Sequence, residues 1–122
     1  HVLEHFSFEE VKTVLDVFYK KIKPGGLLRL SVPDFSLMAE SYLTKKVPLK
    51  SLKYALMGGQ DYEYNFHKSV YDFETLVQVL NDAGFTNAKE YETIKDFGLD
   101  LGDWSTGEIA TYPVSLNVKA RK

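Results

Sequence analysis

The chain has 122 residues, a formal net charge of -2 and no cysteine, and 44% of its residues are hydrophobic while 26% are charged. This composition is ordinary for a globular protein and excludes a disordered chain, and the lack of cysteine excludes disulfides, thiolate zinc sites and cysteine nucleophiles. No apolar run approaches the roughly 18 residues of a membrane helix, and no basic excess favours nucleic acid. We therefore expect a cytoplasmic protein with no membrane or nucleic-acid partner.

A capping box predicts the first helix. Ser7 and Glu10 have the spacing at which a serine hydroxyl and a glutamate carboxylate satisfy each other's free backbone N–H groups. Apolar residues then recur at helical spacing as far as Ile22, and the Pro-Gly-Gly turn that begins at Pro24 ends the helix.

The next segments predict a strand and two helices. The mostly apolar run Leu27–Val32 predicts a strand, and residues 34–42 and 48–58 predict helices, the second closed by a glycine. A helix, a glycine turn and a strand form the second half of a βαβ crossover, whose partner is a strand before the helix. We therefore interpret residues 1–3 as the end of that earlier strand.

The second half of the chain begins with a polar and aromatic segment, residues 58–71. Residues 72–84 predict a helix that starts at an aspartate cap and ends at a glycine. Residues 88–94 predict a strand, residues 96–112 a long loop, and residues 114–120, which alternate apolar and polar side chains, a final strand. The element order indicates a single α/β domain over residues 1–122.

Residues 1–5 match H-x-x-E-H, a signature of zinc proteases. That chemistry needs both histidines on one helical face, Glu4 as general base and a third ligand, for which Glu74 is a candidate. The capping box, however, starts the helix at Ser7, after the motif. We therefore expect no metal site, and a zinc hydrolase is the weakest alternative.

The order of the motifs resembles the class I S-adenosylmethionine-dependent methyltransferases of types 11 and 23. The segments that carry the resemblance are Val2–His5, Lys23–Gly26, Ser31–Asp34 and Asn81–Phe85, which resemble the family's "vLEH", "LKPGG", "SVPD" and "eAGF" motifs, and Val114–Lys122, which resembles its last strand. The resemblance covers essentially the whole chain. It implies the C-terminal half of a Rossmann-like fold, with a three-stranded mixed sheet and flanking helices.

The resemblance also implies S-adenosylmethionine as cofactor and methyl transfer to a small molecule or saccharide. The family's glycine-rich cofactor loop and its ribose-binding acidic residue have no counterpart in these 122 residues, and we expect them before His1. We therefore expect a truncated domain that binds the cofactor weakly or not at all and is inactive alone.

The roles that the resemblance implies fall on a short set of residues. His67 or His5 would be the general base, because an unperturbed histidine titrates near neutral pH. The other positions are His1, Leu3 and Glu4 for the cofactor, and Pro33, Asp34, Gln60 and Tyr64 for the acceptor. The simpler alternatives are that His5 only ends a strand, that His67 is a solvated loop residue, and that Glu4 and Asp34 cap helices.

A second hypothesis is a non-catalytic, self-associating α/β fragment. In the family's sheet the strand Leu27–Val32 pairs with an earlier strand, nearly all of which is missing here. An unpaired apolar edge strand attracts another chain. We therefore expect a homodimer or larger oligomer through that edge or through helix faces.

Overall fold

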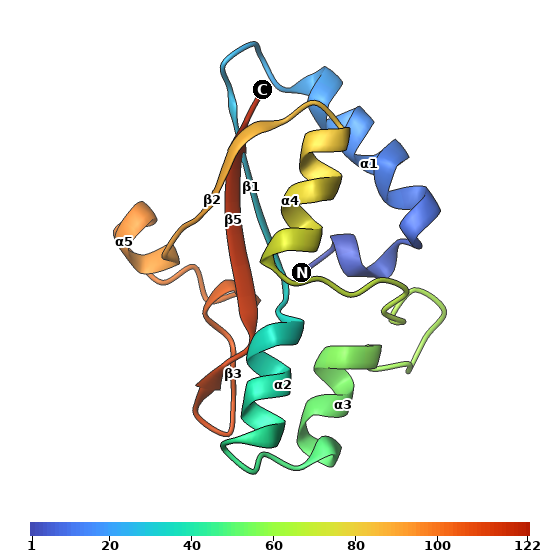
Figure 1. Ribbon diagram of the computed structural model, residues 1–122, viewed down its shortest axis with the longest axis vertical. Helices are drawn as coiled ribbons and strands as arrows, with labels where there is room; N and C mark the ends of the chain where they lie inside the picture. The colour runs from blue at the N-terminus through green and yellow to red at the C-terminus, as the bar shows by residue number, and fades with distance from the viewer.

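A computed structural model describes all residues, 1–122, and Figure 1 labels its elements. The helices are α1 (Phe8–Lys21), α2 (Phe35–Leu43), α3 (Leu49–Met57), α4 (Phe73–Asp82) and α5 (Thr93–Phe97), with short 3-10 turns η1 (Leu3–His5) and η2 (Trp104–Thr106). The strands are β1 (Leu27–Pro33), β2 (Thr86–Glu90), β3 (Glu108–Ile109), β4 (Tyr112–Pro113) and β5 (Ser115–Arg121).

The main sheet has three strands in the order β1-β5-β2. Both β1 and β2 pair with β5 in antiparallel orientation, so the three expected strands are present but the expectation of a mixed sheet is wrong. The reason is that no strand parallel to β1 pairs with it within the described chain. A second, two-stranded sheet joins β3 to β4.

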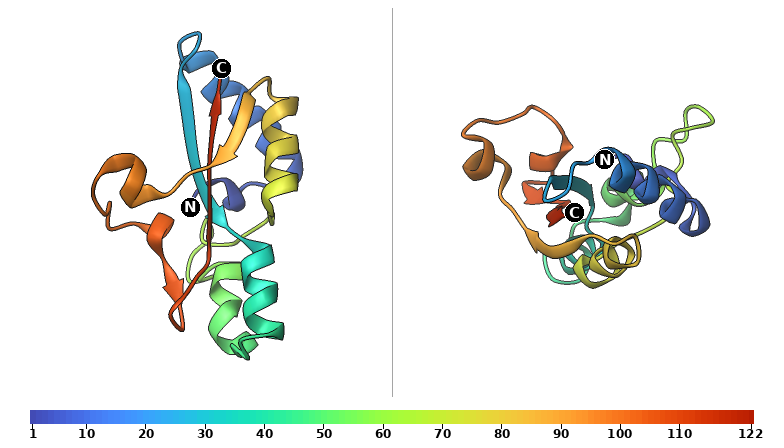
Figure 2. Two further views of the ribbon diagram at one scale, coloured as in Figure 1. Left: turned by 60° about the vertical axis from the view of Figure 1, so that its left-hand side comes forward. Right: turned by 90° about the horizontal axis from the view of Figure 1, so that it is seen from above.

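Helices α1 and α4 cover one face of the main sheet, as Figures 1 and 2 show. Alternate residues of β1 and β5 point to this face, where Leu30 lies opposite Val118 and Val32 lies opposite Leu116. Leu15 of α1 and Leu76 of α4 pack there and are fully buried. This core confirms the helical periodicity of α1 and α4 and the alternation of β5.

The opposite face of the sheet is covered by residues 91–112, of which the sequence predicts residues 96–112 to be a long loop. This segment instead contains α5, η2 and the β3–β4 hairpin. The guanidinium of Arg29 in β1 lies 4.1 Å from the ring centre of Phe97, and Lys119 of β5 donates a hydrogen bond to Asp96. These contacts from the sheet, rather than local sequence preferences, position the short elements.

The α2–α3 hairpin extends from the end of β1 (Figure 2) and packs around a small core of Met38, Val47, Leu52 and Val114.

Two predicted helix caps are present in the structure: the capping box of Ser7 and Glu10 at the start of α1, and the aspartate cap of α4 at Asp72. None of the helices has the length and hydrophobicity needed to cross a bilayer.

Two boundaries differ from the sequence prediction. Residues 1–3 do not end a strand, because Leu3–His5 form a 3-10 turn whose Glu4 carbonyl accepts backbone hydrogen bonds from Lys68 and Ser69. The strand expected at residues 88–94 instead spans Thr86–Glu90, and Thr93 already belongs to α5.

Candidate functional site

A cavity of about 470 Å³ lies where β1 ends, between η1, the C-terminal end of α3 and the segment that carries η2. Its size is within the usual range of small-molecule sites, about 300–1,000 Å³. The residues that line it are His1, Glu4, His5, Tyr54, Ala55, Gly58, Gly59, Asn65, His67, Trp104, Ile109 and Val114. All three histidines of the chain belong to this lining.

Glu4 places a carboxylate in the interior at the wall of this cavity. The residue is only 1% exposed, and neither of its side-chain oxygens has a hydrogen-bond partner. Burial raises the pKa of Glu4, because removing the carboxylate from water disfavours its charged form. Its backbone carbonyl accepts from the N–H groups of Lys68 at 2.7 Å and Ser69 at 3.2 Å, which anchors η1 to the segment after α3.

That segment brings His67 to Glu4 from 63 positions further along the chain (67 − 4). The backbone N–H of His67 donates to the Met57 carbonyl at 3.1 Å, and its Nδ1 lies 2.9 Å from the carbonyl oxygen of Ala55. A carbonyl can only accept, so Nδ1 carries the hydrogen and Nε2 of the neutral ring has a free lone pair. Burial lowers the pKa of His67, which favours this neutral form.

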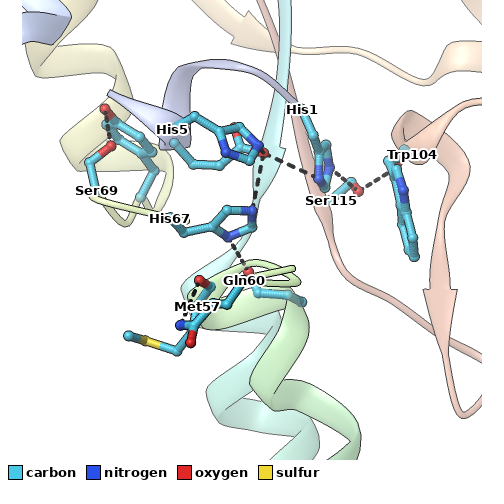
Figure 3. Close-up of polar contacts among 11 residues, drawn as sticks. His1, His5, Met57, Gln60, His67, Ser69, Trp104 and Ser115 are labelled. Carbon is cyan, nitrogen blue, oxygen red and sulfur yellow. Dashed lines mark hydrogen bonds and ion pairs between the residues drawn. The ribbon is translucent and has the colours of Figure 1, made fainter. Parts of the chain in front are cut away.

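His5 and His1 complete this group, and Figure 3 shows both beside His67. The ring of His5 meets that of His67 edge to face, with 4.8 Å between the ring centres. His1 stacks beside the Trp104 ring at 5.9 Å, and its Nε2 lies 2.8 Å from the hydroxyl oxygen of Ser115. The Glu4 Oε1 atom is 3.6 Å from Nδ1 of His1 and 3.9 Å from Nε2 of both His5 and His67.

The structure therefore brings together four of the residues that the resemblance implies: His1, Glu4, His5 and His67. The possibility that His67 is a solvated loop residue is excluded, because its side chain is 9% exposed. Ligand atoms of Glu4, His5 and His67 lie within 4.8 Å of one another, an arrangement that can hold a metal ion or share a proton. Glu74, the third zinc ligand considered above, is exposed on α4 and is not in this group.

The other implied residues lie outside the cavity lining. The Leu3 side chain is buried in the main core, and Pro33 ends β1. Asp34 caps α2, because its carboxylate accepts from the backbone N–H groups of Ser36 and Leu37. Gln60 and Tyr64 are exposed, the latter by 74%.

Sequence reasoning missed several residues of the site. Trp104 and Ser115 contact His1, and Tyr54 lines the cavity from α3. Trp104 lies in the segment predicted as a loop, and the one available signal was that it is the single tryptophan of the chain. Ser115 occupies an ordinary polar position of an alternating strand, so nothing in the sequence distinguished it.

No family model and no curated protein matches this sequence. Among solved structures, the fold is similar to the crystal structure of a SAM-dependent methyltransferase from Archaeoglobus fulgidus, with a TM-score of 0.53 and 19% sequence identity. The match covers all of this chain and 56% of that chain. The likeness shows a methyltransferase-like fold, with flanking helices on an antiparallel sheet.

Proposed function

We propose that this chain forms the acceptor-side part of an S-adenosylmethionine-dependent methyltransferase that acts on a small molecule or a saccharide. The observation that carries the proposal is the group of Glu4, His5 and His67 in a cavity at the end of β1. Ligands of open α/β sheets bind outside the carboxyl ends of strands. The carboxyl end of β1 is next to this cavity, since the backbone N–H of Asp34 donates to the carbonyl of Val114, which lines it. The methyltransferase-like fold agrees with this assignment.

The proposed reaction is an in-line displacement. A nucleophilic atom of the acceptor attacks the methyl carbon, the carbon–sulfur bond breaks, and S-adenosylhomocysteine leaves. Such a transfer needs an acceptor held in line and a group that takes its proton. In this proposal Nε2 of His67 or His5 accepts the proton, and the segment from His1 to Glu4 borders the methionine end of the cofactor. Leu3 would contribute only its backbone, because its side chain is in the core.

The cofactor's own binding loop is not among the described residues, and this chain covers 56% of the methyltransferase to which it is similar. We therefore propose that the 122-residue chain alone binds S-adenosylhomocysteine weakly or not at all. Isothermal titration calorimetry with S-adenosylhomocysteine tests this, and micromolar binding with defined stoichiometry would contradict it.

Activity is tested on the protein produced from its complete reading frame, with radiolabelled S-adenosylmethionine and a panel of saccharides and small hydroxylated acceptors. Transfer to at least one acceptor is expected, and His67→Ala should lower kcat by about 100-fold or more, the usual contribution of a general base. Glu74→Gln, on the exposed side of α4, is the matched control and should keep wild-type activity. A folded protein that methylates none of the acceptors would refute the proposal.

A second proposal is that two copies of the 122-residue chain associate along β1. The observation that favours it is the sheet order, in which β1 is seven residues long and hydrogen-bonded on one side only, to β5. Leu27 at its start is 40% exposed. Unpaired N–H and C=O groups of such an edge pair readily with another strand.

A further inference from the structure

The carboxylate of Glu4 and the three imidazoles around it form a largely buried polar group at the wall of the cavity. Both oxygens of Glu4 lack a hydrogen-bond partner although the residue is 1% exposed. The three imidazole nitrogens that face Oε1 stand 3.6–3.9 Å away, beyond hydrogen-bonding distance. Burying a carboxylate whose oxygens have no hydrogen-bond partner is costly, and a ligand that pairs with both oxygens would remove this cost.

The hydrogen bonds on the far sides of two rings fix which nitrogens face Glu4. Nδ1 of His67 donates to the Ala55 carbonyl, so its Nε2 presents a lone pair to the carboxylate. The hydroxyl of Ser115 donates to the Trp104 carbonyl, so its oxygen accepts from Nε2 of His1 and leaves the lone pair of Nδ1 facing Glu4. Two lone pairs and a carboxylate therefore converge on one space.

A cation between these atoms would satisfy all of them at once. Divalent zinc binds histidine nitrogens and carboxylate oxygens at about 2.0–2.2 Å, which separates neighbouring ligand atoms by roughly 3.3–3.6 Å. The ligand atoms of Glu4, His5 and His67 lie within 4.8 Å of one another, so a small inward shift of the side chains suffices. We propose that Glu4, His5 and His67, with His1 beside them, bind a divalent first-row transition ion.

The donor set indicates the class of ion. Imidazole and carboxylate ligands suit Zn²⁺, Mn²⁺ or Fe²⁺, and the chain has no cysteine to favour a thiolate-bound metal. The backbone hydrogen bond of His67 and the hydroxyl contact of His1 are the outer partners that orient metal-binding imidazoles. Because the group lines the cavity, a coordination position would remain open to a small molecule.

A bound ion would also have a part in the proposed methyl transfer, and only this part depends on the proposed function. His5 and His67 would then hold the ion, and the ion would take over the task that the proposed function gives these two residues as bases. It would act as a Lewis acid that lowers the pKa of an acceptor hydroxyl at the open position, so that the hydroxyl proton could pass to water while the acceptor oxygen displaces S-adenosylhomocysteine from the methyl carbon. The metal site itself does not depend on this step.

Calorimetric titration of ZnCl₂ into the 122-residue chain, purified without a histidine tag and treated with a chelator, tests the site. The wild type is expected to bind one ion per chain. Glu4→Gln keeps the shape of the side chain but removes its charge. It should weaken zinc binding by about 100-fold or more, because losing a ligand should cost at least as much affinity as losing a residue that only orients a ligand. Glu74→Gln is the charge-matched control and should bind like the wild type.

Thermal unfolding and X-ray absorption give readouts that do not depend on activity. Without metal, Glu4→Gln should unfold at a higher temperature than the wild type, because it removes a buried unpaired charge. With saturating Zn²⁺ the order should reverse, since only the wild type gains stability from the bound ion. The zinc absorption spectrum should show nitrogen and oxygen neighbours with imidazole scattering.

Three results would overturn the metal site: no saturable heat with wild type, unchanged affinity in Glu4→Gln, or an unfolding temperature that Zn²⁺ does not raise. The catalytic step is tested separately, by removing metal from the protein of the complete reading frame. Methyl transfer that survives chelation refutes the ion's part in the reaction. Metal binding without any methyl transfer refutes the proposed function and leaves the site intact.

Discussion

Gly58 positions the catalytic candidate His67 although it has no side chain of its own. It ends α3 with φ +79°, a backbone conformation that other residues rarely adopt. A Cβ atom at this position would stand 2.3 Å from the backbone oxygen of Asn65. The missing side chain therefore lets the segment after α3 fold back on the helix end, where His67 reaches the carbonyl of Ala55.

Replacing two glycines by alanine distinguishes the cost of a steric clash from the cost of a positive φ. Gly58→Ala is expected to lower the free energy of unfolding by about 2 kcal/mol or more, because it adds a steric clash to the penalty for a positive φ. Gly98→Ala is the control, since Gly98 has φ +73° but nothing within 4 Å of an added Cβ. It should cost only about 1 kcal/mol. Urea denaturation measures both, and equal losses would contradict the steric argument.

At the scale of elements, α5 is held to the sheet by charge as well as by packing. The Asp96 carboxylate of α5 accepts a hydrogen bond from Lys119 of β5 and lies 4.0 Å from the guanidinium of Arg29 in β1. The hydrogen bond from Lys119 holds the pKa of Asp96 below its ordinary value of 3.8. A carboxylate with a lowered pKa stabilises the folded state when it is ionised.

The pH dependence of this contact has a definite sign. The contribution of Asp96 is fully present above its unfolded pKa, near 3.8, and is lost as the pH falls through its lower folded pKa. Asp96→Asn should therefore be less stable than the wild type at pH 7, and this difference should shrink below pH 4. Asp16→Asn, in an exposed pair with Lys12, should change stability little at either pH. Urea denaturation at both pH values measures the difference in free energy of unfolding between each variant and the wild type. If this difference is the same at both pH values for Asp96→Asn, the ionised Asp96–Lys119 pair is not its source.

Local signals predicted the elements whose ends are determined within a few residues. The Ser7–Glu10 capping box, the cap at Asp72 and the alternation of β5 depend on neighbours in sequence, and all are confirmed. Elements positioned by distant contacts were missed. Leu3–His5 turns because Lys68 and Ser69 hold the Glu4 carbonyl, and α5 depends on Arg29 and Lys119 of the sheet.

In the candidate site, too, the sequence predicted what depends on a local motif and missed what depends on distant contacts. The motif order selected His1, Glu4, His5 and His67, which do meet at the cavity. The partners that orient them, the Ala55 carbonyl and the Ser115 hydroxyl, lie 12 and 114 positions away in the chain. No local pattern connects such pairs. Asp34 was assigned to the acceptor, but its carboxylate is occupied by the N-terminus of α2.

At the scale of the whole molecule, the open edge at β1 determines how copies of the chain would assemble. If two chains pair along this edge, a charge at its exposed end should prevent it. Leu27→Lys, at a position 40% exposed, is expected to give a monomer where the wild type gives a dimer. Leu43→Lys, at a position 66% exposed at the end of α2, is the control and should stay dimeric. Light scattering at high concentration measures the mass, and a monomeric wild type would exclude the pairing.

The position of β5 between β1 and β2 also affects the order of folding. The two outer strands come earlier in the chain and do not pair with each other, so neither has a partner in the sheet until β5 is present. Pairs such as Leu28 with Ala120 join residues from nearly opposite ends of the sequence. On a ribosome, α1 and the α2–α3 hairpin can form as they emerge, whereas the sheet and its core must wait for residues 115–121.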